Sequence, residues 1–296
     1  MRIVNLVPNN LQEFINYCKK YKQEHDESFL SDMELDSFNI NDNPTVLLMD
    51  ENNNITGAAS LMLTKPFKEN HKARFRILHS TEASIEAYKP MLEALLKDVN
   101  NIDYVYVFLP ETKGYVGTIF KELGFTIERY SWVLKISNDE IKHSAFPSGF
   151  RVDPFVEGRD ETIWCNIVNE SFKNIAGHID ITADMINTNK DSEEYIENGM
   201  LVLWNEDKAV GLIQVSKDIE EGEECAYIGP IAILPEYQGK GLGRHLLRTG
   251  LELAQSSNFN FTILTVNGEN SKAAELYLSE GFEKIDVFIC YRMLIS

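Results

Sequence analysis

The sequence predicts an α/β (α+β) protein made of two tandem domains that follow one plan. The first observation is size, because 296 residues with 44% apolar side chains are enough for two hydrophobic cores. The second is an internal duplication, in which segments of the first half recur at a constant spacing in the second. The third is an apolar run that passes through a glycine-rich loop into an amphipathic pattern, as in α/β units that bind an anion.

The duplication is visible in three pairs of segments. The strand-like runs "YVYVFL" and "FTILTV" begin at Tyr104 and Phe261, and 261 − 104 gives a spacing of 157 residues. The stretches "IFKELGF" and "LYLSEGF" begin at Ile119 and Leu276 and repeat this spacing, since 276 − 119 is also 157. The runs "TIERYSWVLKI" and "EKIDVFICYRMLI" then follow as closing strands. We interpret the pattern as two copies of a strand, helix, Gly-Phe and strand unit.

A polar segment, "SNDEIKHSAFPSG", separates the two halves and contains a proline and a glycine, which interrupt regular structure. We therefore place the boundary near Phe146 and predict domains at residues 1–146 and 147–296. In the second domain, periodicity and polar turns predict a strand at 150–152, a helix at about 160–172, a loop and further helix to about 198, and strands at 200–206, 208–217 and 225–234.

The last of these strands contains an unusual pair, Gly229-Pro230. Proline cannot donate to a sheet ladder and glycine weakens a strand, so the pair predicts a bulge or a local parting of neighbouring strands. Main-chain groups near Ile231, Ala232 and Ile233 would then lack a ladder partner. Because buried main-chain groups need a partner, these three residues are candidates for contact with a ligand.

A glycine-rich loop, "PEYQGKGLGRHLL", follows at residues 235–247. It fits neither a Walker loop nor a dinucleotide fingerprint, and instead reads Q-x-x-G-x-G before an apolar helix pattern. Loop amides and a helix N-terminus attract an anion such as a pyrophosphate, and two basic side chains add charge. The alternative is an ordinary glycine turn. The candidate anion-binding residues are Gln238, Gly239, Lys240, Gly241, Leu242, Gly243 and Arg244, the last of which we expect to open the helix.

A second helix is expected in "NSKAAELYLSEGF". Asn270 is well placed as its N-cap and Gly281 as the left-handed residue that ends it. Ala273 and Tyr277 are four residues apart and share a face. A small residue and a phenol on that face would line a channel for an extended ligand and place a hydroxyl at its end; the alternative for Tyr277 is a packed core residue.

At this point the second half resembles the GNAT family of N-acetyltransferases, over about residues 150–296. The stretches "IAILPEYQGKGLGRHLL" and "NSKAAELYLSEGF" match the two acetyl-CoA motifs of that family in order and spacing. The resemblance implies that each of the two tandem domains is a mixed, mostly antiparallel twisted sheet flanked by helices. The stretch "IVNESFKNIAGHIDITADM" is also distantly similar to tandem-GNAT proteins such as mycothiol synthase, a likeness that does not carry a substrate over.

The resemblance also implies roles for the candidate residues. The loop amides would hold the pyrophosphate of acetyl-CoA, the main chain of 231–233 would pair with the pantetheine arm, and Asn270 would contact that arm. Tyr277 matches the tyrosine that protonates the departing thiolate. For the general base, Tyr227 occupies the position of the glutamate that family members often use, and Glu224 lies just upstream. The alternatives are a water chain as base, and Glu224 as part of a solvated loop.

The first half departs from the family pattern where the coenzyme would bind. Its expected phosphate loop, "HSTEASIEAY", has no glycine and carries two glutamates. Phe120 occupies the position of Tyr277, and Lys113 that of Asn270. We therefore predict a degenerate GNAT-like domain that lacks the acetyl-CoA loop. Its expected role is to complete the fold, to wall the substrate cleft or to bind a regulator.

Composition limits the partners. The formal charge of −18 argues against nucleic acid, because phosphate backbones need a basic face. No apolar stretch approaches the ~20 residues of a membrane span, and the start "MRIVNLVPNN" has no secretory pattern. The four cysteines form no C-x-x-C pair, so we expect neither a metal site nor disulfides, and a cytoplasmic location. We expect a monomer or homodimer.

The resulting hypothesis is an acetyl-CoA-dependent N-acetyltransferase, with acetyl-CoA as co-substrate and a small-molecule or peptide amine as acceptor. The amine would attack the thioester directly, with Tyr277 as the acid. Two alternatives stay open: a non-catalytic acyl-CoA-binding or sensing module, and a transferase for a longer acyl group. The sequence does not identify the acceptor or the general base.

Overall fold

The computed structural model describes residues 1–25, 30–97, 99–175, 177–186, 192 and 194–295, and it divides into two compact units. Unit 1 comprises Met1–Ser131 together with Asp286–Ser296, and unit 2 comprises Trp132–Ile285. This division differs from the predicted boundary near Phe146. The physical reason is that the last strand of the chain pairs antiparallel with a strand of unit 1 at Phe288–Leu294, so the C-terminal segment belongs to unit 1.

Unit 1 has the strand order β1-β2-β3-β4-β5-β12. All of these neighbours are antiparallel except β4 and β5, which pair in parallel. The elements that contribute to it are β1 (Arg2–Asn5), α1 (Leu11–Lys20), α2 (Asp32–Asp36), β2 (Thr45–Met49), β3 (Ile55–Met62), α3 (Lys65–Glu69), β4 (Lys72–Ser80), α4 (Ile85–Leu96), β5 (Tyr104–Pro110), α5 (Gly114–Glu122), and parts of β6 (Thr126–Ser137) and β12 (Glu283–Leu294).

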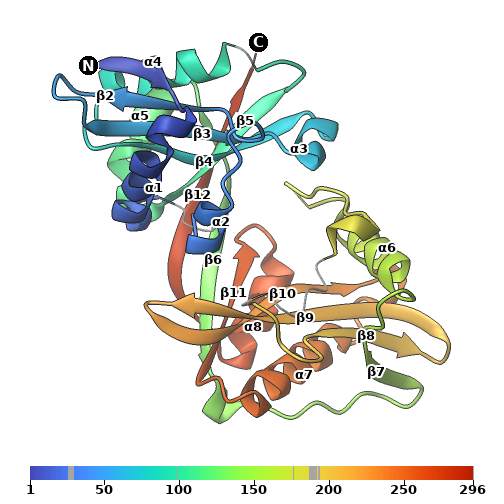
Figure 1. Ribbon diagram of the computed structural model, residues 1–296. Coiled ribbons are helices and arrows are strands. Elements are labelled where there is room, and N and C mark those ends of the chain that lie inside the picture. The colour runs from blue at the N-terminus through green and yellow to red at the C-terminus, as the bar shows by residue number, and fades with distance from the viewer. Residues whose placement is uncertain (26–29, 98, 176, 187–191, 193, 296) are drawn as a thin grey trace. The chain divides into compact units, whose positions relative to one another are not determined.

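Unit 2 has the order β6-β11-β10-β9-β8-β7, and β10 and β11 are its parallel pair. Its own elements are β7 (Phe150–Pro154), α6 (Glu161–Phe172), β8 (Met200–Asn205), β9 (Lys208–Glu220), β10 (Glu223–Ile233), α7 (Leu242–Ser256), β11 (Phe261–Asn267) and α8 (Ser271–Glu280) (Figure 1). The predicted strands and the helix at 160–172 are confirmed; β7, β9 and β10 are longer than expected and β8 is one residue shorter. Of the further helix predicted before residue 198, the described residues show a short 3-10 helix at Ala183–Met185, and residues 187–191 and 193 lie outside the described part of the chain.

The duplication is confirmed element by element. Strands β5 and β11 each have seven residues and start 157 positions apart, at Tyr104 and Phe261. Strands β6 and β12 each have twelve residues and start at Thr126 and Glu283, again 157 apart. Each copy therefore contains the same mixed sheet of mostly antiparallel strands with one parallel pair.

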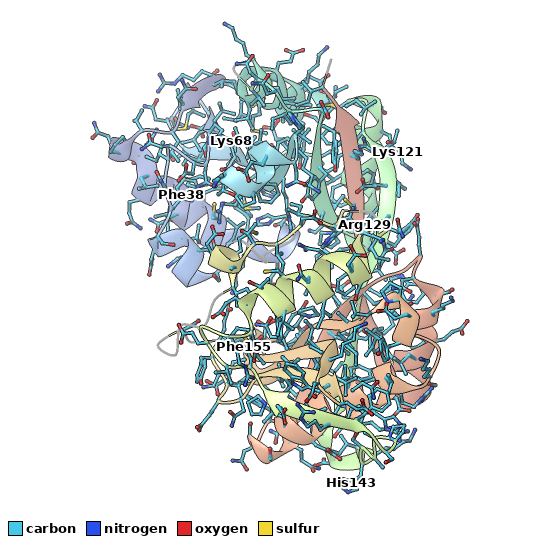
Figure 2. The ribbon with its side chains drawn as sticks, turned by 90° about the vertical axis from the view of Figure 1, so that its right-hand side faces the viewer. Phe38, Lys68, Lys121, Arg129, His143 and Phe155 are labelled. Carbon is cyan, nitrogen blue, oxygen red and sulfur yellow. The ribbon has the colours of Figure 1, made fainter. Side chains whose placement is uncertain are left out.

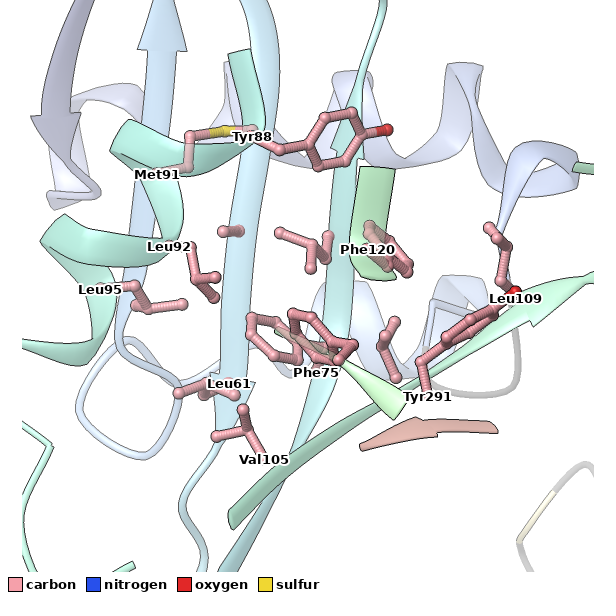
Figure 3. Packing of buried hydrophobic residues seen from close by; sticks show 14 of the residues in the cluster. Leu61, Phe75, Tyr88, Met91, Leu92, Leu95, Val105, Leu109, Phe120 and Tyr291 are labelled. Atoms are coloured by element: carbon pink, nitrogen blue, oxygen red, sulfur yellow. The ribbon is translucent and has the colours of Figure 1, made fainter. Parts of the chain in front are cut away.

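Helices cover both faces of each sheet. In unit 1, α4 and α5 pack on one face and α1 on the other. The α4/α5 side holds a large aromatic cluster that includes Tyr88, Phe120 and Tyr291 (Figure 3). In unit 2, α7 and α8 pack on one face and α6 on the other. All four cysteines are buried and free. No helix among the described residues combines the length and apolar character needed to cross a membrane.

Candidate active site

The parallel strands of unit 2 are paired only near their beginnings. The register joins Ala226–Ile228 of β10 to Thr262–Leu264 of β11, although the strands continue to Ile233 and Asn267. The pairing of β10 with β9 shifts register between Ile228 and Ile231. This confirms the bulge predicted from Gly229-Pro230, because a residue pair with a weak ladder preference interrupts the strand.

Beside the bulge, fewer main-chain N–H and C=O groups lack a hydrogen-bond partner than the sequence predicts. Ile231, Ala232 and Ile233 pair with β9 on one side. The carbonyl oxygen of Ile233 also accepts hydrogen bonds from Gln238 Nε2 at 2.8 Å and from Ser171 Oγ at 3.1 Å. The side of this segment that faces β11 is therefore open to a ligand at Ile231 and Ala232, while the Ile233 carbonyl already has partners.

The glycine loop presents a row of unpartnered amides at the start of α7. Gln238 N–H donates to Pro235 O at 3.2 Å, and Arg244 N–H to Gly241 O at 3.1 Å. Between them, the N–H groups of residues 239–243 donate to no other group in the described part of the chain. The structure thus narrows the predicted set of seven to five consecutive amides at a helix N-terminus, which is an arrangement that binds anions.

The three loop glycines differ in their backbone conformation and in the space around them. Gly239 and Gly241 have φ of +75° and +80°, a left-handed backbone that side chains disfavour. Gly241 is also the N-cap, so α7 begins at Leu242, two residues before the predicted start. Gly243 has an ordinary helical backbone, and a Cβ added there would meet only Leu276 Cδ2 at 3.8 Å. Packing within the protein therefore does not require glycine at position 243. The space that a side chain would take there is available to a ligand bound at the loop amides.

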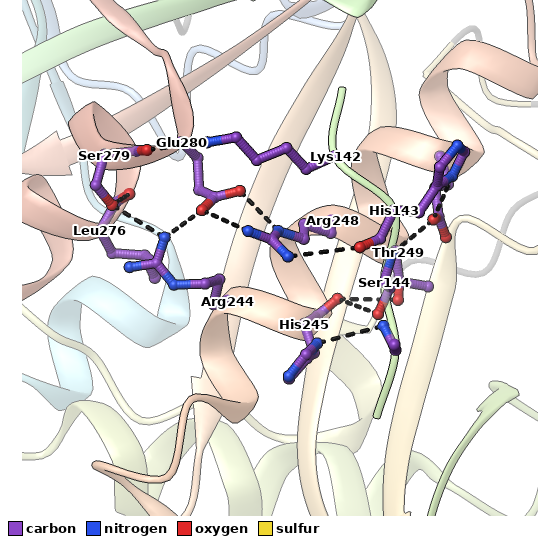
Figure 4. Close-up of polar contacts among 12 residues, drawn as sticks. Lys142, His143, Ser144, Arg244, His245, Arg248, Thr249, Leu276, Ser279 and Glu280 are labelled. Atoms are coloured by element: carbon purple, nitrogen blue, oxygen red, sulfur yellow. Dashed lines mark hydrogen bonds and ion pairs between the residues drawn. The ribbon is translucent and has the colours of Figure 1, made fainter. Parts of the chain in front are cut away.

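The basic residues beside the loop are not equivalent. Lys240 is exposed, with its Nζ 4.8 Å from the centroid of the Tyr237 ring. Arg244 donates instead to the carboxylate of Glu280 and to Ser279 Oγ (Figure 4). The predicted contribution of Arg244 to the anion charge is therefore largely offset by Glu280, which sequence reasoning missed because it lies 36 residues away.

The helix α8 has the predicted ends. Asn270 Oδ1 accepts from Ala273 N–H at 3.3 Å as the N-cap, and Gly281 closes the helix with φ of +106°. Ala273 and Tyr277 both lie against the unit 2 core and are partly buried. The amide NH2 of Asn270 remains available to a ligand, because the cap uses only its oxygen.

Tyr277 packs against the unit 2 core, near Tyr227 of β10. Its ring packs edge-on against Phe282, with 5.9 Å between the centroids. Its hydroxyl forms no hydrogen bond with any of the described residues. Burial, followed by the neighbouring Tyr227, raises the pKa of Tyr277 to about 12. The phenol is therefore protonated at neutral pH and free to donate a hydrogen bond.

The two base candidates are placed very differently. Tyr227 lies close enough to Tyr277 to affect its pKa, and its hydroxyl is 2.8 Å from Thr265 Oγ1 of β11. Glu224 is exposed near the start of β10, paired with Ile219, and alternation along the strand directs it to the opposite face from Tyr227. At ~3.3 Å per residue it lies roughly 17 Å along the strand from Gly229. The structure brings Tyr227 and Tyr277 together and leaves Glu224 apart.

The corresponding region of unit 1 is filled by its own side chains. Phe120, at the position of Tyr277, is fully buried between Tyr88 and Tyr291, with ring centroids 5.6 Å from each. At the end of β4, Tyr17 Oη lies 2.7 Å from His79 Nδ1, and His79 Nε2 lies 3.5 Å from Glu24 Oε2. The same carboxylate accepts from Lys113 Nζ at 3.2 Å.

The space left beside this network is a cavity of about 10 Å³, room for roughly one water. Burial, followed by the charge of His25, lowers the pKa of His79 to about 4. For the whole chain, the described residues contain no group of three or more His, Cys, Asp or Glu side chains arranged to hold a metal.

Comparison with known proteins finds a family match over part of unit 2. Residues 162–282 match the acetyltransferase (GNAT) family. The mycothiol acetyltransferase of Kocuria rhizophila is 29% identical over 153 residues, which are 50% of this chain and 50% of that protein. The mycothiol acetyltransferase of Nocardiopsis dassonvillei is 27% identical over 48% of this chain and 44% of the relative. The chain thus spans about half the length of these curated relatives.

Solved structures extend the likeness to the whole fold. A GCN5-related N-acetyltransferase from Sphaerobacter thermophilus has a TM-score of 0.73 at 15% identity, covering 99% of this chain and 95% of that one. A tandem GNAT protein from the clavulanic acid biosynthesis pathway has a TM-score of 0.66 at 12% identity, covering 99% and 98%. At these identities the likeness concerns the fold alone. Together with the family match over residues 162–282 and the mycothiol acetyltransferase relatives, it supports a GNAT superfamily protein with mycothiol synthase-like similarity.

Proposed function

We propose that the chain is an N-acetyltransferase that moves an acetyl group from acetyl-CoA to a primary amine. The observation that carries the proposal is the row of five unpartnered amides at residues 239–243, placed at the start of α7. It follows directly after a strand whose end is open on one side. A pyrophosphate on the amides and an extended arm along β10 use both features.

Acetyl-CoA supplies a thioester, and attack of a neutral amine on its carbonyl carbon forms the amide, breaks the C–S bond and leaves a thiolate. The Tyr277 hydroxyl stabilises that thiolate. Proton transfer from a phenol of pKa about 12 to a thiolate with a reference pKa of ~8.5 is uphill by roughly 5 kcal/mol, so Tyr277 acts mainly as a hydrogen-bond donor. The amide N–H groups near the β10 bulge face the carbonyl oxygen, and the amine proton leaves through water or the nearby Tyr227.

We assign the acetyl-CoA site to unit 2 alone. Unit 1 has no glycine loop, and its equivalent region is filled by Phe120 and by the network of Tyr17, His79, Glu24 and Lys113. Calorimetry with acetyl-CoA should therefore give one site per chain. Two equivalent sites would contradict the assignment of unit 1.

The reaction is tested with acetyl-CoA and a library of primary amines, by following release of the thiol and the mass of the amide product. Tight coenzyme binding with no acetylated amine would favour the acyl-CoA-sensing alternative. A comparison of acetyl-CoA with propionyl-, butyryl- and hexanoyl-CoA tests the longer-acyl alternative, which a higher kcat/KM for a longer chain would support. We place the reaction in a reducing cytoplasm, in keeping with four free, buried thiols.

A further inference from the structure

Tyr227 and Thr265 form a pair of hydroxyl groups at the place where β10 and β11 part. The Oη and Oγ1 atoms of the two residues are 2.8 Å apart. The last paired residues of the two strands are Ile228 and Leu264, so Thr265 is the first residue of β11 beyond the pairing. Strand β11 lies inside the sheet, between β6 and β10, and Thr265 is nevertheless exposed. Thr265 therefore connects the opening between the strands with solvent.

The pair lies on a face of the sheet where an acceptor has room. Ile228 packs in the core under α7, so strand alternation directs Tyr227 to the opposite face, which α6 covers. Ser216, the partner of Tyr227 across the β9/β10 ladder, lines a cavity of about 270 Å³ on that face. Phe155, labelled in Figure 2, lines the same cavity. Tyr277 belongs to α8 on the other face, beside α7 and its free amides. The proposed reaction thus has one hydroxyl on the coenzyme side and another on the acceptor side.

The internal duplication supplies a comparison for this pair. Thr265 corresponds to Phe108, since 265 − 108 is 157, the spacing of β5 and β11. Tyr227 corresponds by register to Arg74, because their parallel partners are residues 263 and 106, and 263 − 106 is also 157. In unit 1 these two positions make a cation–π contact, with Arg74 Cζ 4.7 Å from the centroid of the Phe108 ring. The fold itself therefore does not require two hydroxyl groups here, and the pair occurs in the unit that has the free loop amides.

The proposed reaction has a proton to remove on the acceptor side. After the amine attacks, its nitrogen carries a positive charge and must lose a proton. A phenol holds its own proton at neutral pH, so Tyr227 can accept the amine proton only if it passes its own proton on. Thr265 Oγ1 is close enough to receive that proton, and the exposed threonine can give its own to water. One proton leaves the nitrogen, one reaches water, and both hydroxyl groups end neutral.

We infer that Thr265 is a positioning residue for acetyl transfer, which holds the Tyr227 hydroxyl at the opening and relays the amine proton from Tyr227 to water. The inference rests on the proposed function, because it takes the opening between β10 and β11 as the place of acetyl transfer. A hydroxyl pair with a structural role only would join the two strands. Its loss would change stability and leave proton transfer unaffected.

The test compares Thr265→Val, which keeps the size of the side chain and removes the hydroxyl, with the matched control Thr265→Ser, which keeps the hydroxyl. The measurement is the single-turnover rate of acetyl transfer to the fastest amine of the library, because it isolates the chemical step. We expect about a tenfold fall in Thr265→Val, below the usual ~10² for a lost proton transfer, since water can partly replace the hydroxyl. Thr265→Ser should retain the wild-type rate. Both variants should keep the calorimetric affinity for acetyl-CoA.

Two further measurements separate the relay from a structural role. N-methylmorpholine is a tertiary amine that accepts a proton and forms no stable amide. Raising its concentration at fixed pH should restore part of the rate of Thr265→Val and leave the wild-type rate unchanged. In a double-mutant cycle, Thr265→Val should cause no further loss in Tyr227→Phe, because the threonine acts through the Tyr227 hydroxyl.

Four results would overturn the inference and leave the proposed function intact. They are an unchanged single-turnover rate in Thr265→Val, an equal loss in Thr265→Ser, no response of Thr265→Val to the added base, and an additive loss in the double variant. The proposed function fails separately, when the wild-type protein binds acetyl-CoA and acetylates no amine of the library. The inference then falls with it.

Discussion

Glu280 and Arg248 form a two-point ion pair at the end of α8, with Nε to Oε2 at 2.8 Å and Nη2 to Oε1 at 3.0 Å. The Glu280 side chain is only 2% exposed, and its second cationic partner is Arg244, in the first turn of α7. Lys142 Nζ adds a hydrogen bond to Ser279 O at 3.3 Å. The pair thus fixes the start of α7, which carries the free amides, against α8, which carries Tyr277 one turn before Glu280.

Replacing Glu280 by glutamine should destabilise unit 2 by about 3 kcal/mol at pH 7, the lower end of the range for breaking a buried pair, because both guanidinium groups remain partly exposed. Burial raises the pKa of Glu280, but the hydrogen bonds from Arg248 and Arg244 outweigh it and leave the pKa lowered. Urea unfolding at several pH values measures the effect, with the exposed Glu275→Gln as control.

The direction of the pKa shift sets the pH dependence of that difference. A carboxyl whose pKa is lower in the folded state stabilises the fold above its unfolded pKa of ~4.3, and the contribution disappears as the pH falls through the folded value. The gap between wild type and Glu280→Gln should therefore be constant from pH 6 to 8 and shrink below pH 4. A gap that grows in acid would mean that Glu280 is not the stabilising charge.

Two glycines of α7 separate a ligand role from a packing role. Gly243→Ala should leave stability unchanged or raise it by up to ~1 kcal/mol, since alanine is the better helix former and its Cβ meets only Leu276 at 3.8 Å. It should nevertheless weaken acetyl-CoA binding at least tenfold, because the Cβ occupies space beside the free amides. Gly250→Ala should do the reverse, since its Cβ would lie 2.5 Å from Ile213 Cδ1 in the core.

The melting temperature and the calorimetric affinity for acetyl-CoA, measured on both variants, test these two expectations. Undiminished affinity in Gly243→Ala would remove that position from the coenzyme site. An affinity loss in Gly250→Ala without a loss of stability would show that the packing account of this glycine is wrong.

Much of this site is local in the sequence, which is why it could be predicted. The bulge at Gly229-Pro230, the Asn270 cap and the left-handed Gly281 each depend on one or two residues and their backbone preferences. The constant spacing of 157 likewise predicted paired elements of equal length in the two units.

What the sequence could not give depends on contacts between distant segments. The ion pair of Arg244 with Glu280 joins residues that are 36 positions apart. The hydrogen bond from Gln238 Nε2 to the Ile233 carbonyl occupies an acceptor that the strand pattern predicts to be open to a ligand. The two compact units also divide at positions other than Phe146, because the linker composition at 137–149 carries no information on the pairing of β12 with β5. Glu224 lies just upstream of the position that matches the family's base, but strand alternation directs it to the opposite face from Tyr227.

The His79 network predicts acid sensitivity in unit 1. A histidine whose pKa falls from 6.5 to about 4 on folding is buried in its neutral form. Its contribution is fully present above pH ~6.5 and is lost as the pH falls towards 4, by up to about 3 kcal/mol. Hydrogen exchange of the β3 and β4 amides at pH 7.5 and 4.5 should show this loss. His79→Gln should reduce the dependence, and an unchanged acid response in that variant would assign it to other groups.

Tyr277→Phe tests the chemistry most directly, because the change keeps the ring against Phe282 and removes only a hydroxyl that bonds to none of the described residues. Stability should change by less than about 0.5 kcal/mol, as for substitutions that break no buried contact. Acetyl-CoA affinity should also be kept, since the free amides and β10 are untouched.

For this variant we expect kcat to fall roughly ten- to hundred-fold, at or below the low end of the range for general acid catalysis. A thiolate is already a fair leaving group, and a phenol of pKa about 12 stabilises it mainly by a hydrogen bond. The measurement is kcat with a saturating amine, beside calorimetric affinity for acetyl-CoA and a melting temperature, with the exposed Tyr130→Phe as control. Unchanged turnover, when chemistry limits the rate, would make Tyr277 a packing residue. Water or another group would then stabilise and protonate the thiolate. A collapse of coenzyme affinity at unchanged kcat would instead make its hydroxyl a binding contact, since an interaction confined to the transition state lowers kcat alone.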